Sequence, residues 1–160
     1  YAIKPHIKER YLLVYETGDA EQLLIKARII ADQKGLKLVQ IRSSLKKDKN
    51  TDVLIRNAGP AEFLGLFIHA DFIVTNSYHG TCFAINFNKQ FLSFKFDKNP
   101  VRARELLKLT GLEERLISTG DSIEIAQKDI CFNKANKIIE MQREKSLKYL
   151  YSALDTPAQT

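Results

Sequence analysis

The sequence predicts a single α/β domain built on an open parallel sheet with helices on both faces. Short apolar runs alternate with amphipathic helical segments, and each connection is long enough for a right-handed crossover. The strand-like runs are apolar on successive residues, as in parallel strands covered on both faces. The chain has 160 residues, of which 44% are hydrophobic, and can therefore bury one core. We expect one domain over residues 1–154 and a disordered tail over residues 155–160.

The first elements are defined by apolar runs and by turn residues. Residues 11–15 form a continuous apolar strand that ends at a turn-like Thr17-Gly18-Asp19. Residues 20–34 carry apolar side chains at helical spacing, and Gly35 is placed to end that helix. Residues 36–41 predict a second strand. Residues 53–55 form either a short strand or a buried corner.

The rest of the chain continues the alternation. Pro60 is suited to the first turn of a helix that extends to residue 68, because proline is tolerated at helix starts. Apolar runs and helical periods then predict a strand at 71–75, a turn at 76–79, a helix at 80–87, a strand at 91–94, a helix at 101–109 and a last helix at 133–154.

Composition restricts the classes of function. The net charge of +6 favours anionic partners without choosing among them, and no basic segment interleaved with aromatic residues indicates nucleic acid. The apolar runs are shorter than the roughly 20 residues that span a bilayer. Cys82 and Cys131 lack the spacing of a metal site or a disulfide scaffold, so we expect reduced, buried thiols in a cytoplasmic protein. We expect no metal and no cofactor.

The turn between the fourth predicted strand and its helix is the candidate site. Ligands of doubly wound sheets bind at the carboxyl ends of strands. Gly80 would let the backbone approach a ligand, and helix-opening amides with the Ser77 and Thr81 hydroxyls would bind a phosphate or carboxylate. His79 could donate a proton or a hydrogen bond there. The alternative is structural, because Ser and Asn before a helix are ordinary N-caps.

Two segments resemble a known signature. They are G-P-A-E-F-L, beginning at Gly59, and A-D-F-I-V-T-N-S-Y-H-G-T-C-F-A-I-N-F-N-K-Q-F, beginning at Ala70. They resemble G-P-x-E-F-L and A-D-x-V-x-T-D-S-F-H-G-T-x-F-S-I-x-F-x-K-P-F of the polysaccharide pyruvyl transferase family, and a looser likeness continues to Leu154. The resemblance implies an enzyme of two Rossmann-like halves in a glycosyltransferase-B-like arrangement, with this chain as the C-terminal half and the N-terminal half absent.

The same resemblance implies a reaction. An enolpyruvyl unit would pass from phosphoenolpyruvate to two hydroxyls of a sugar, in a polysaccharide or its lipid-linked precursor, leaving a pyruvate ketal. His79 would be catalytic, with Asn76, Ser77, Gly80 and Thr81 holding substrate. The expected partners are phosphoenolpyruvate and a sugar or glycolipid acceptor at the inner face of the membrane. We expect peripheral membrane association, self-association, and no activity from this half alone.

Two residues depart from the family pattern. Asn76 stands where Asp is usual, and Tyr78 stands where Phe is usual. Asn supplies a hydrogen bond without a negative charge near His79, so Glu62 is the candidate for a substitute carboxylate. Arg102 is a candidate anion clamp because guanidinium groups bind phosphate and carboxylate bidentately, and Arg42 and Arg104 are further candidates.

Two other functions are compatible with these residues. A nucleotide-sugar glycosyltransferase would place a donor diphosphate at an equivalent helix start, and a fold does not decide chemistry. A non-catalytic half that only binds an anion is the other alternative.

Overall fold

The computed structural model describes residues 1–18, 21–42, 48–95 and 101–154. Within these ranges six parallel strands form one sheet in the order β3-β2-β1-β4-β5-β6. The strand order reverses between β1 and β4, as in doubly wound sheets. The α/β prediction is therefore confirmed, and of the two alternatives for residues 53–55 the structure has the short strand. The strands are β1 (Tyr11–Tyr15), β2 (Lys37–Ile41), β3 (Val53–Ile55), β4 (Phe72–Thr75), β5 (Gln90–Phe94) and β6 (Leu116–Ile117).

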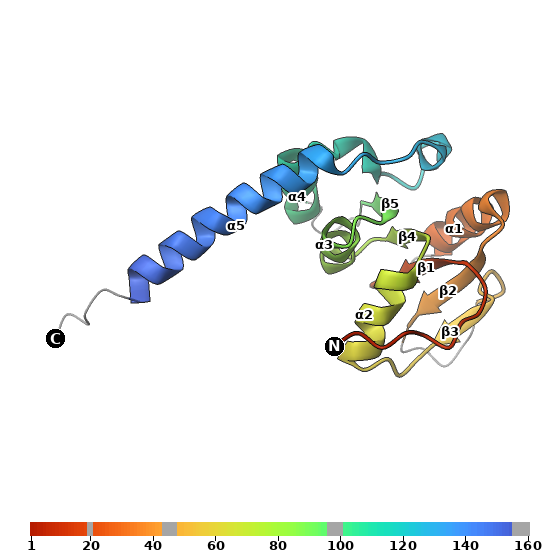
Figure 1. Cartoon of the computed structure of the whole chain (residues 1–160). Coiled ribbons are helices and arrows are strands. Elements are labelled where there is room, and N and C mark those ends of the chain that lie inside the picture. Colours follow the sequence, from red (N-terminus) through yellow and green to blue (C-terminus); the bar gives the residue numbers. More distant parts are fainter. Residues whose placement is uncertain (19–20, 43–47, 96–100, 155–160) are drawn as a thin grey trace.

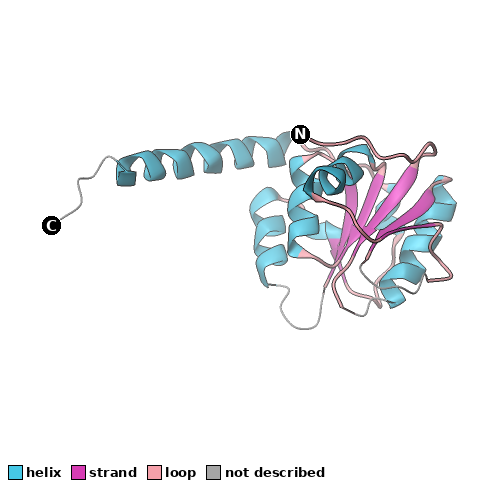
Figure 2. Ribbon diagram, turned by 90° about the horizontal axis from the view of Figure 1, so that it is seen from below, coloured by secondary structure: helices cyan, strands magenta, loops and turns pink. Residues whose placement is uncertain are grey.

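Helices cover both faces of the sheet (Figures 1 and 2). On one face, α1 and a short 3-10 helix, η2, pack over Leu12, Val14 and their neighbours. On the other face, α2, α3, α4 and the start of α5 pack over Tyr11, Leu13 and Ile73. Side chains alternate between faces along a strand, so two covered faces require a continuous apolar run. The helices are α1 (Glu21–Lys34), α2 (Pro60–His69), α3 (Tyr78–Asn86), α4 (Val101–Thr110), α5 (Asn133–Leu154), η1 (Glu113–Arg115) and η2 (Glu124–Gln127).

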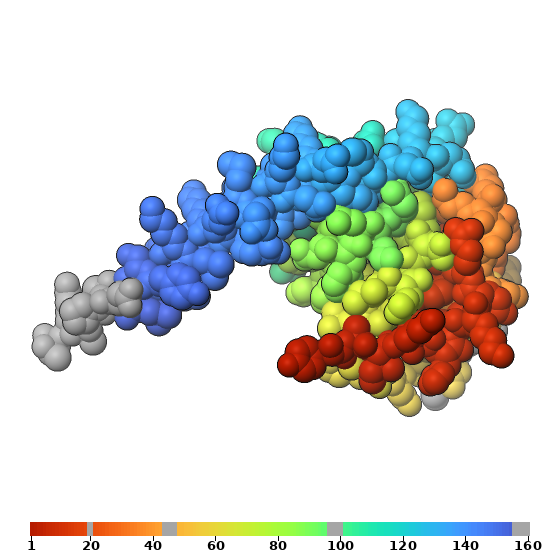
Figure 3. All heavy atoms as spheres, viewed as in Figure 1, coloured from red at the N-terminus to blue at the C-terminus, as the bar shows by residue number. Residues whose placement is uncertain are grey.

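Helix α5 extends away from the rest of the molecule (Figures 1 and 3). Its first turns pack on the body through the buried Ala135 and the half-buried Ile139. Beyond them its apolar side chains are exposed, including Tyr149 and Tyr151. The predicted tail at residues 155–160 lies outside the described residues. Among the residues that are described, no helix is long and apolar enough to cross a membrane.

Three details differ from the sequence predictions. Helix α3 begins at Tyr78 rather than Gly80, because Ser77 caps it. Strand β6 was not predicted, since two residues show no periodicity. The Cys131 thiol is exposed rather than buried, whereas Cys82 is partly buried.

The edge of the sheet at β6 depends on a buried arginine. Arg115 is fully buried, and its guanidinium donates to the carbonyl oxygens of Ile125 at 3.0 Å and Lys128 at 2.7 Å. Glu114 provides an ion pair at 3.5 Å. These contacts tie β6 to the segment that contains η2, which packs on the α1 face of the sheet. Arg115 therefore acts as a structural residue.

We expect Arg115→Met to lower the free energy of unfolding by about 2–4 kcal/mol, because a buried guanidinium and its bonds to two part-buried carbonyl groups are lost. Urea denaturation followed by circular dichroism measures the change. Arg143→Met is the matched control: Arg143 is an exposed arginine of α5, where about 0.5 kcal/mol or less is expected. Equal unfolding midpoints for the two variants would contradict the structural role of Arg115.

Candidate functional site

Polar side chains follow the first five strands at the carboxyl edge of the sheet. In a parallel sheet these positions lie along the same edge, where ligands of doubly wound proteins bind. Strands β1 and β4 are neighbours there although about 60 residues separate them, and their registers align Tyr15 with Thr75. The residues that directly follow β1 to β5 are Glu16, Arg42, Arg56, Asn76 and Lys95.

Asn76 joins the ends of β1 and β4. Its amide oxygen accepts from the backbone N–H of Thr17 at 2.8 Å, and its amide nitrogen donates to the Thr17 carbonyl at 2.9 Å. A side-chain amide can both accept and donate in this way. An ionised aspartate could not donate, so the pairing explains why Asn suits this position. The side chain thus acts on the protein backbone in this structure.

Ser77 caps helix α3 from a buried position. Its hydroxyl accepts from the Gly80 N–H at 3.5 Å, and its own N–H donates to the Thr75 hydroxyl at 3.0 Å. The Thr75 hydroxyl in turn donates to the Tyr15 carbonyl at 2.6 Å. This is the N-cap role that the sequence left open as an alternative.

Gly80 allows the start of α3 to lie against β4. A Cβ at this position would approach the Thr75 hydroxyl oxygen to 2.3 Å, far inside any normal contact. The space that glycine leaves is therefore occupied by Thr75 of the protein. Close packing of helix on strand explains this glycine without a ligand.

The Thr81 hydroxyl is directed into the core. Thr81 is fully buried, and its hydroxyl is bonded to the Ser77 carbonyl at 3.1 Å and lies 2.9 Å from the Ser93 hydroxyl. The first contact is made within the start of α3, and the second connects α3 to β5 of the sheet. In this arrangement the Thr81 and Ser77 hydroxyls hold the helix start in place and do not face solvent.

His79 is exposed in the first turn of α3 and lies beside two other side chains. Its ring is 5.5 Å from the ring of Tyr78 at an interplanar angle of 66°. The guanidinium of Arg102, from the first turn of α4, lies 4.9 Å from the centroid of the Tyr78 ring. A cation over an aromatic face is attracted by its quadrupole. The structure therefore brings His79 and the candidate clamp Arg102 together around Tyr78.

Tyr78 is held in its neutral form. Its hydrogen bond with Cys82, one helical turn further on, raises the pKa of the Tyr78 hydroxyl above its ordinary value, and burial adds to this. Burial likewise raises the pKa of the Cys82 thiol. At neutral pH the pair is an uncharged platform beneath Arg102, and Cys82 is not a thiolate nucleophile.

Glu62 lies in a different environment from the one we expected. It is exposed in the first turn of α2 and lines a hollow with the N-terminal segment, which includes Lys4 and His6. In the described part of the chain no hydrogen bond or ion pair joins Glu62 to His79. In this structure Glu62 does not supply a carboxylate to the imidazole.

A buried polar network at the ends of β1 and β2 was missed in the sequence. Gln40 donates to the Glu16 carboxylate at 2.8 Å and accepts from the Thr51 hydroxyl at 2.7 Å. Arg42 contacts the same Glu16 oxygen at 3.4 Å. The sequence did contain an indication of this network, because a charged residue directly follows each of the two buried strands. Parallel strands align these positions at one edge of the sheet.

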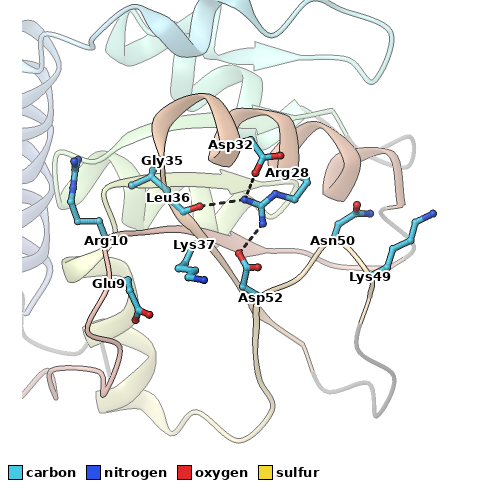
Figure 4. A pocket seen from close by; sticks show the side chains of 10 residues that line it. All are labelled: Glu9, Arg10, Arg28, Asp32, Gly35, Leu36, Lys37, Lys49, Asn50 and Asp52. Atoms are coloured by element: carbon cyan, nitrogen blue, oxygen red, sulfur yellow. Dashed lines mark hydrogen bonds and ion pairs between the residues drawn. The ribbon is translucent and has the colours of Figure 1, made fainter.

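A second polar cluster lies at the opposite, amino edge of the sheet (Figure 4). Arg28 of α1 pairs with Asp32 at 2.6 Å and with Asp52 at 2.7 Å, and donates to the Leu36 carbonyl at 3.3 Å. Asp52 also accepts from the Leu38 N–H at 2.7 Å. These contacts join α1 to the starts of β2 and β3. We interpret the cluster as structural.

The N-terminal three-fifths of the chain match one sequence family. The model of the polysaccharide pyruvyl transferase family matches residues 1–98. The chain belongs to this family. The matched range contains β1 to β5 and His79, and it ends before Arg102, so the family match does not include the Arg102 side of the site. No curated protein matches the chain.

Two solved structures resemble the chain at low sequence identity. One is described as the glycotransferase of kitacinnamycin, with 14% identity and a TM-score of 0.57, over 85% of this chain and 39% of that one. Another is a UDP-GlcNAc 2-epimerase from Methanocaldococcus jannaschii, with 16% identity and a TM-score of 0.45, over 82% of this chain and 38% of that one. The chain thus spans about two-fifths of the length of either structure. The first likeness agrees with the Rossmann-like fold.

We expect Asn76→Asp to destabilise the protein at pH 7 by about 1–2 kcal/mol, because the carboxylate cannot donate to the Thr17 carbonyl and repels it. The loss should shrink below about pH 4, where a protonated carboxyl can donate again. Urea denaturation at pH 7 and pH 3.5 measures both effects. Asn57→Asp, in an exposed loop, is the control and should change stability by less than about 0.5 kcal/mol. A pH-independent loss would contradict the proposed pairing.

The Asp52 cluster predicts an acid-sensitive contribution to stability. Burial alone would raise the pKa of Asp52, but the hydrogen bonds from Leu38 and Arg28 outweigh it and hold the pKa below its ordinary value. The stabilisation is therefore present above the unfolded-state pKa of about 4 and is lost as the pH falls through the lower folded pKa.

Asp52→Asn should accordingly be less stable than the wild type at pH 7, and the difference should narrow below about pH 4. Denaturation midpoints measured from pH 2 to pH 7 provide the comparison. Glu144→Gln, on the exposed part of α5, should run parallel to the wild type throughout. A gap for Asp52→Asn that stayed constant with pH would count against the pairing.

Proposed function

We propose that this chain is the donor-binding half of a transferase that moves an enolpyruvyl unit from phosphoenolpyruvate to a sugar. The observation that carries the proposal is the grouping of His79, Tyr78 and Arg102 at the carboxyl edge of the sheet. The family membership of the chain supports a transferase that acts on polysaccharide.

The proposed donor site has three kinds of anion-binding group. Arg102 lies over the Tyr78 ring, and its guanidinium carries N–H groups that can bind a carboxylate or phosphate. The first-turn amides of Tyr78 and His79 have no intrahelical acceptors, as at any helix start. We propose that these amides, and not the Ser77 and Thr81 hydroxyls, bind the anion, because both hydroxyls bond within the protein. His79 contributes a donor at the solvent side.

The chemistry needs proton transfer and charge stabilisation. Protonation of the methylene carbon of phosphoenolpyruvate makes its C2 electrophilic, and a sugar hydroxyl attacks there. The second sugar hydroxyl then adds to C2 as phosphate leaves. The proton of one hydroxyl restores the group that protonated the methylene carbon, and the proton of the other leaves with phosphate. His79 is proposed either to donate to the methylene carbon or to stabilise charge on the phosphate and carboxylate.

We expect His79→Ala to reduce ketal formation by about 10²–10⁴-fold in an enzyme that contains both halves, without loss of folding. Phosphate release from phosphoenolpyruvate in the presence of acceptor measures the effect. His6→Ala, which removes an exposed histidine of the N-terminal segment, is the matched control. Near-normal turnover in His79→Ala would end the proposal.

The two roles of His79 give different results with His79→Gln. Glutamine can donate a hydrogen bond but cannot deliver a proton, so substantial activity in that variant would favour charge stabilisation. Activity as low as that of His79→Ala would favour proton transfer. Arg102→Ala should raise the KM for phosphoenolpyruvate, because a carboxylate or phosphate contact is lost.

A nucleotide-sugar glycosyltransferase is the second candidate, and the likeness to the kitacinnamycin glycotransferase favours it. A thermal-shift experiment separates the two, because a ligand raises the melting temperature of the protein that binds it. Phosphoenolpyruvate should stabilise the chain and UDP-sugars should not. The reverse result would favour the glycosyltransferase. Stabilisation by phosphoenolpyruvate without turnover in the two-half enzyme would favour the non-catalytic alternative.

The setting of the reaction is part of the same proposal. The acceptor is a sugar or glycolipid, and the reaction takes place in the cytoplasm at the inner face of the membrane. The exposed apolar residues of α5 support contact with another surface, either an N-terminal half or a second copy of the chain.

A further inference from the structure

A hollow opens at the carboxyl edge, over the ends of β1, β2 and β3, and the proposed donor site does not use it. Its volume is about 770 Å³. Arg42 and Arg56, the residues that follow β2 and β3, line it together with Glu16. Tyr15 of β1 and Phe63 of α2 form another part of its lining.

The position of Arg42 in this hollow is fixed by contacts within the protein. Glu16 holds it through the 3.4 Å ion pair, and the buried hydrogen bonds of Gln40 and Thr51 hold Glu16. The Glu16 side chain is 1% exposed, whereas the Arg42 side chain is 35% exposed. A ligand can therefore reach the guanidinium of Arg42 but not the carboxylate beneath it. A guanidinium has five N–H donors, and Arg42 pairs with Glu16 through one nitrogen, Nη1.

The lining has an apolar part as well as a cationic part. The rings of Tyr15 and Phe63 meet edge to face, with centroids 5.1 Å apart. Ile41 and Ala58 extend this apolar wall. Ligand sites combine such walls with a few convergent polar groups and have volumes of roughly 300–1,000 Å³. The hollow is much larger than an inorganic anion.

We infer that this hollow binds a phosphorylated sugar, with its phosphate at Arg42 and Arg56 and its sugar ring against Tyr15 and Phe63. Guanidinium groups bind phosphate bidentately, and the aromatic rings offer apolar surface to the C–H face of a pyranose. The inference rests on the proposed function and deepens it, because the acceptor is then a sugar recognised through its phosphate.

The position of the hollow connects it to the donor site. Thr17 and Gly18 line the hollow, and Thr17 is the residue that Asn76 binds. Asn76 lies three residues before His79 on the same strand-to-helix connection. Thr17 thus links the lining of the hollow to the connection that carries His79, and we place the phosphorylated acceptor beside the donor on this basis.

Isothermal titration calorimetry on the whole chain tests the inference. The probes are inorganic phosphate, the α-1-phosphates of glucose, galactose and mannose, unphosphorylated glucose, and phosphoenolpyruvate. At least one hexose 1-phosphate should bind about tenfold or more tightly than inorganic phosphate, because its sugar ring makes an additional contact with the apolar wall of the hollow. Glucose without phosphate should bind more weakly than that hexose 1-phosphate.

Variants assign the binding to the hollow. Arg42→Ala and Arg56→Ala should each weaken hexose 1-phosphate binding about tenfold or more, because a charge-assisted contact is lost. Arg143→Ala, on α5, is the matched control and should bind normally. Phe63→Leu should weaken hexose 1-phosphate binding while inorganic phosphate binding stays the same. If Arg42→Ala unfolds, as circular dichroism would show, Arg56→Ala at an exposed position decides the question.

Several results would overturn the inference. The first is that no hexose 1-phosphate binds more tightly than inorganic phosphate. The second is that hexose 1-phosphate binding is unchanged in both arginine variants. The third is that these variants lose phosphoenolpyruvate binding, which would make the hollow part of the donor site.

The donor proposal fails separately. If phosphoenolpyruvate does not bind, or binds equally well to His79→Ala and Arg102→Ala, the proposed function is wrong even if the hollow binds hexose 1-phosphates. Binding of hexose 1-phosphate that persists in His79→Ala shows that the two sites are independent.

Discussion

The pair of hydrogen bonds between the Asn76 side chain and the Thr17 backbone connects the two strand ends at which the sheet reverses its order. On one side of this contact the chain continues into α3 and His79. On the other side the β1 loop lines the hollow that contains Arg42. Each end of the amide bonds to a backbone group, so an uncharged side chain with both a donor and an acceptor is needed. The geometry of both sites follows from that contact.

Most polar residues of the strand-to-helix turn serve to place His79 rather than to surround a ligand. Ser77 caps α3, Gly80 lets α3 lie on Thr75, and Thr81 is bonded inside the core. A histidine on the first turn of a helix so firmly attached to the sheet has a well-defined backbone position. Positioned donors lose little entropy when they meet a transition state, which is the general advantage of such rigid sites. The motif is thus largely a device for placing one exposed imidazole.

Charge at the carboxyl edge is organised by strand order. The residues that follow β2 and β3 are arginines, and the one that follows β1 is a buried glutamate that holds the first of them. The amino edge has its own paired cluster around Arg28, in which acidic and basic groups bind one another. We therefore interpret the amino-edge cluster as structural and propose ligand binding at the carboxyl edge. Helix α5 adds a third region, whose exposed apolar side chains have no cover within the described residues.

The sequence by itself determined the alternation of strands and helices, the identity of the central turn and the family, because these depend on local periodicity and on contiguous residues. It did not reveal β6, whose two residues are held by Arg115 through distant carbonyl groups. It also did not show that Ser77 and Thr81 face inward, that Arg102 lies on Tyr78, or that Glu16, Gln40 and Arg42 form one network. Each of these depends on which residues from separate strands and helices become neighbours, and only the tertiary structure decides that.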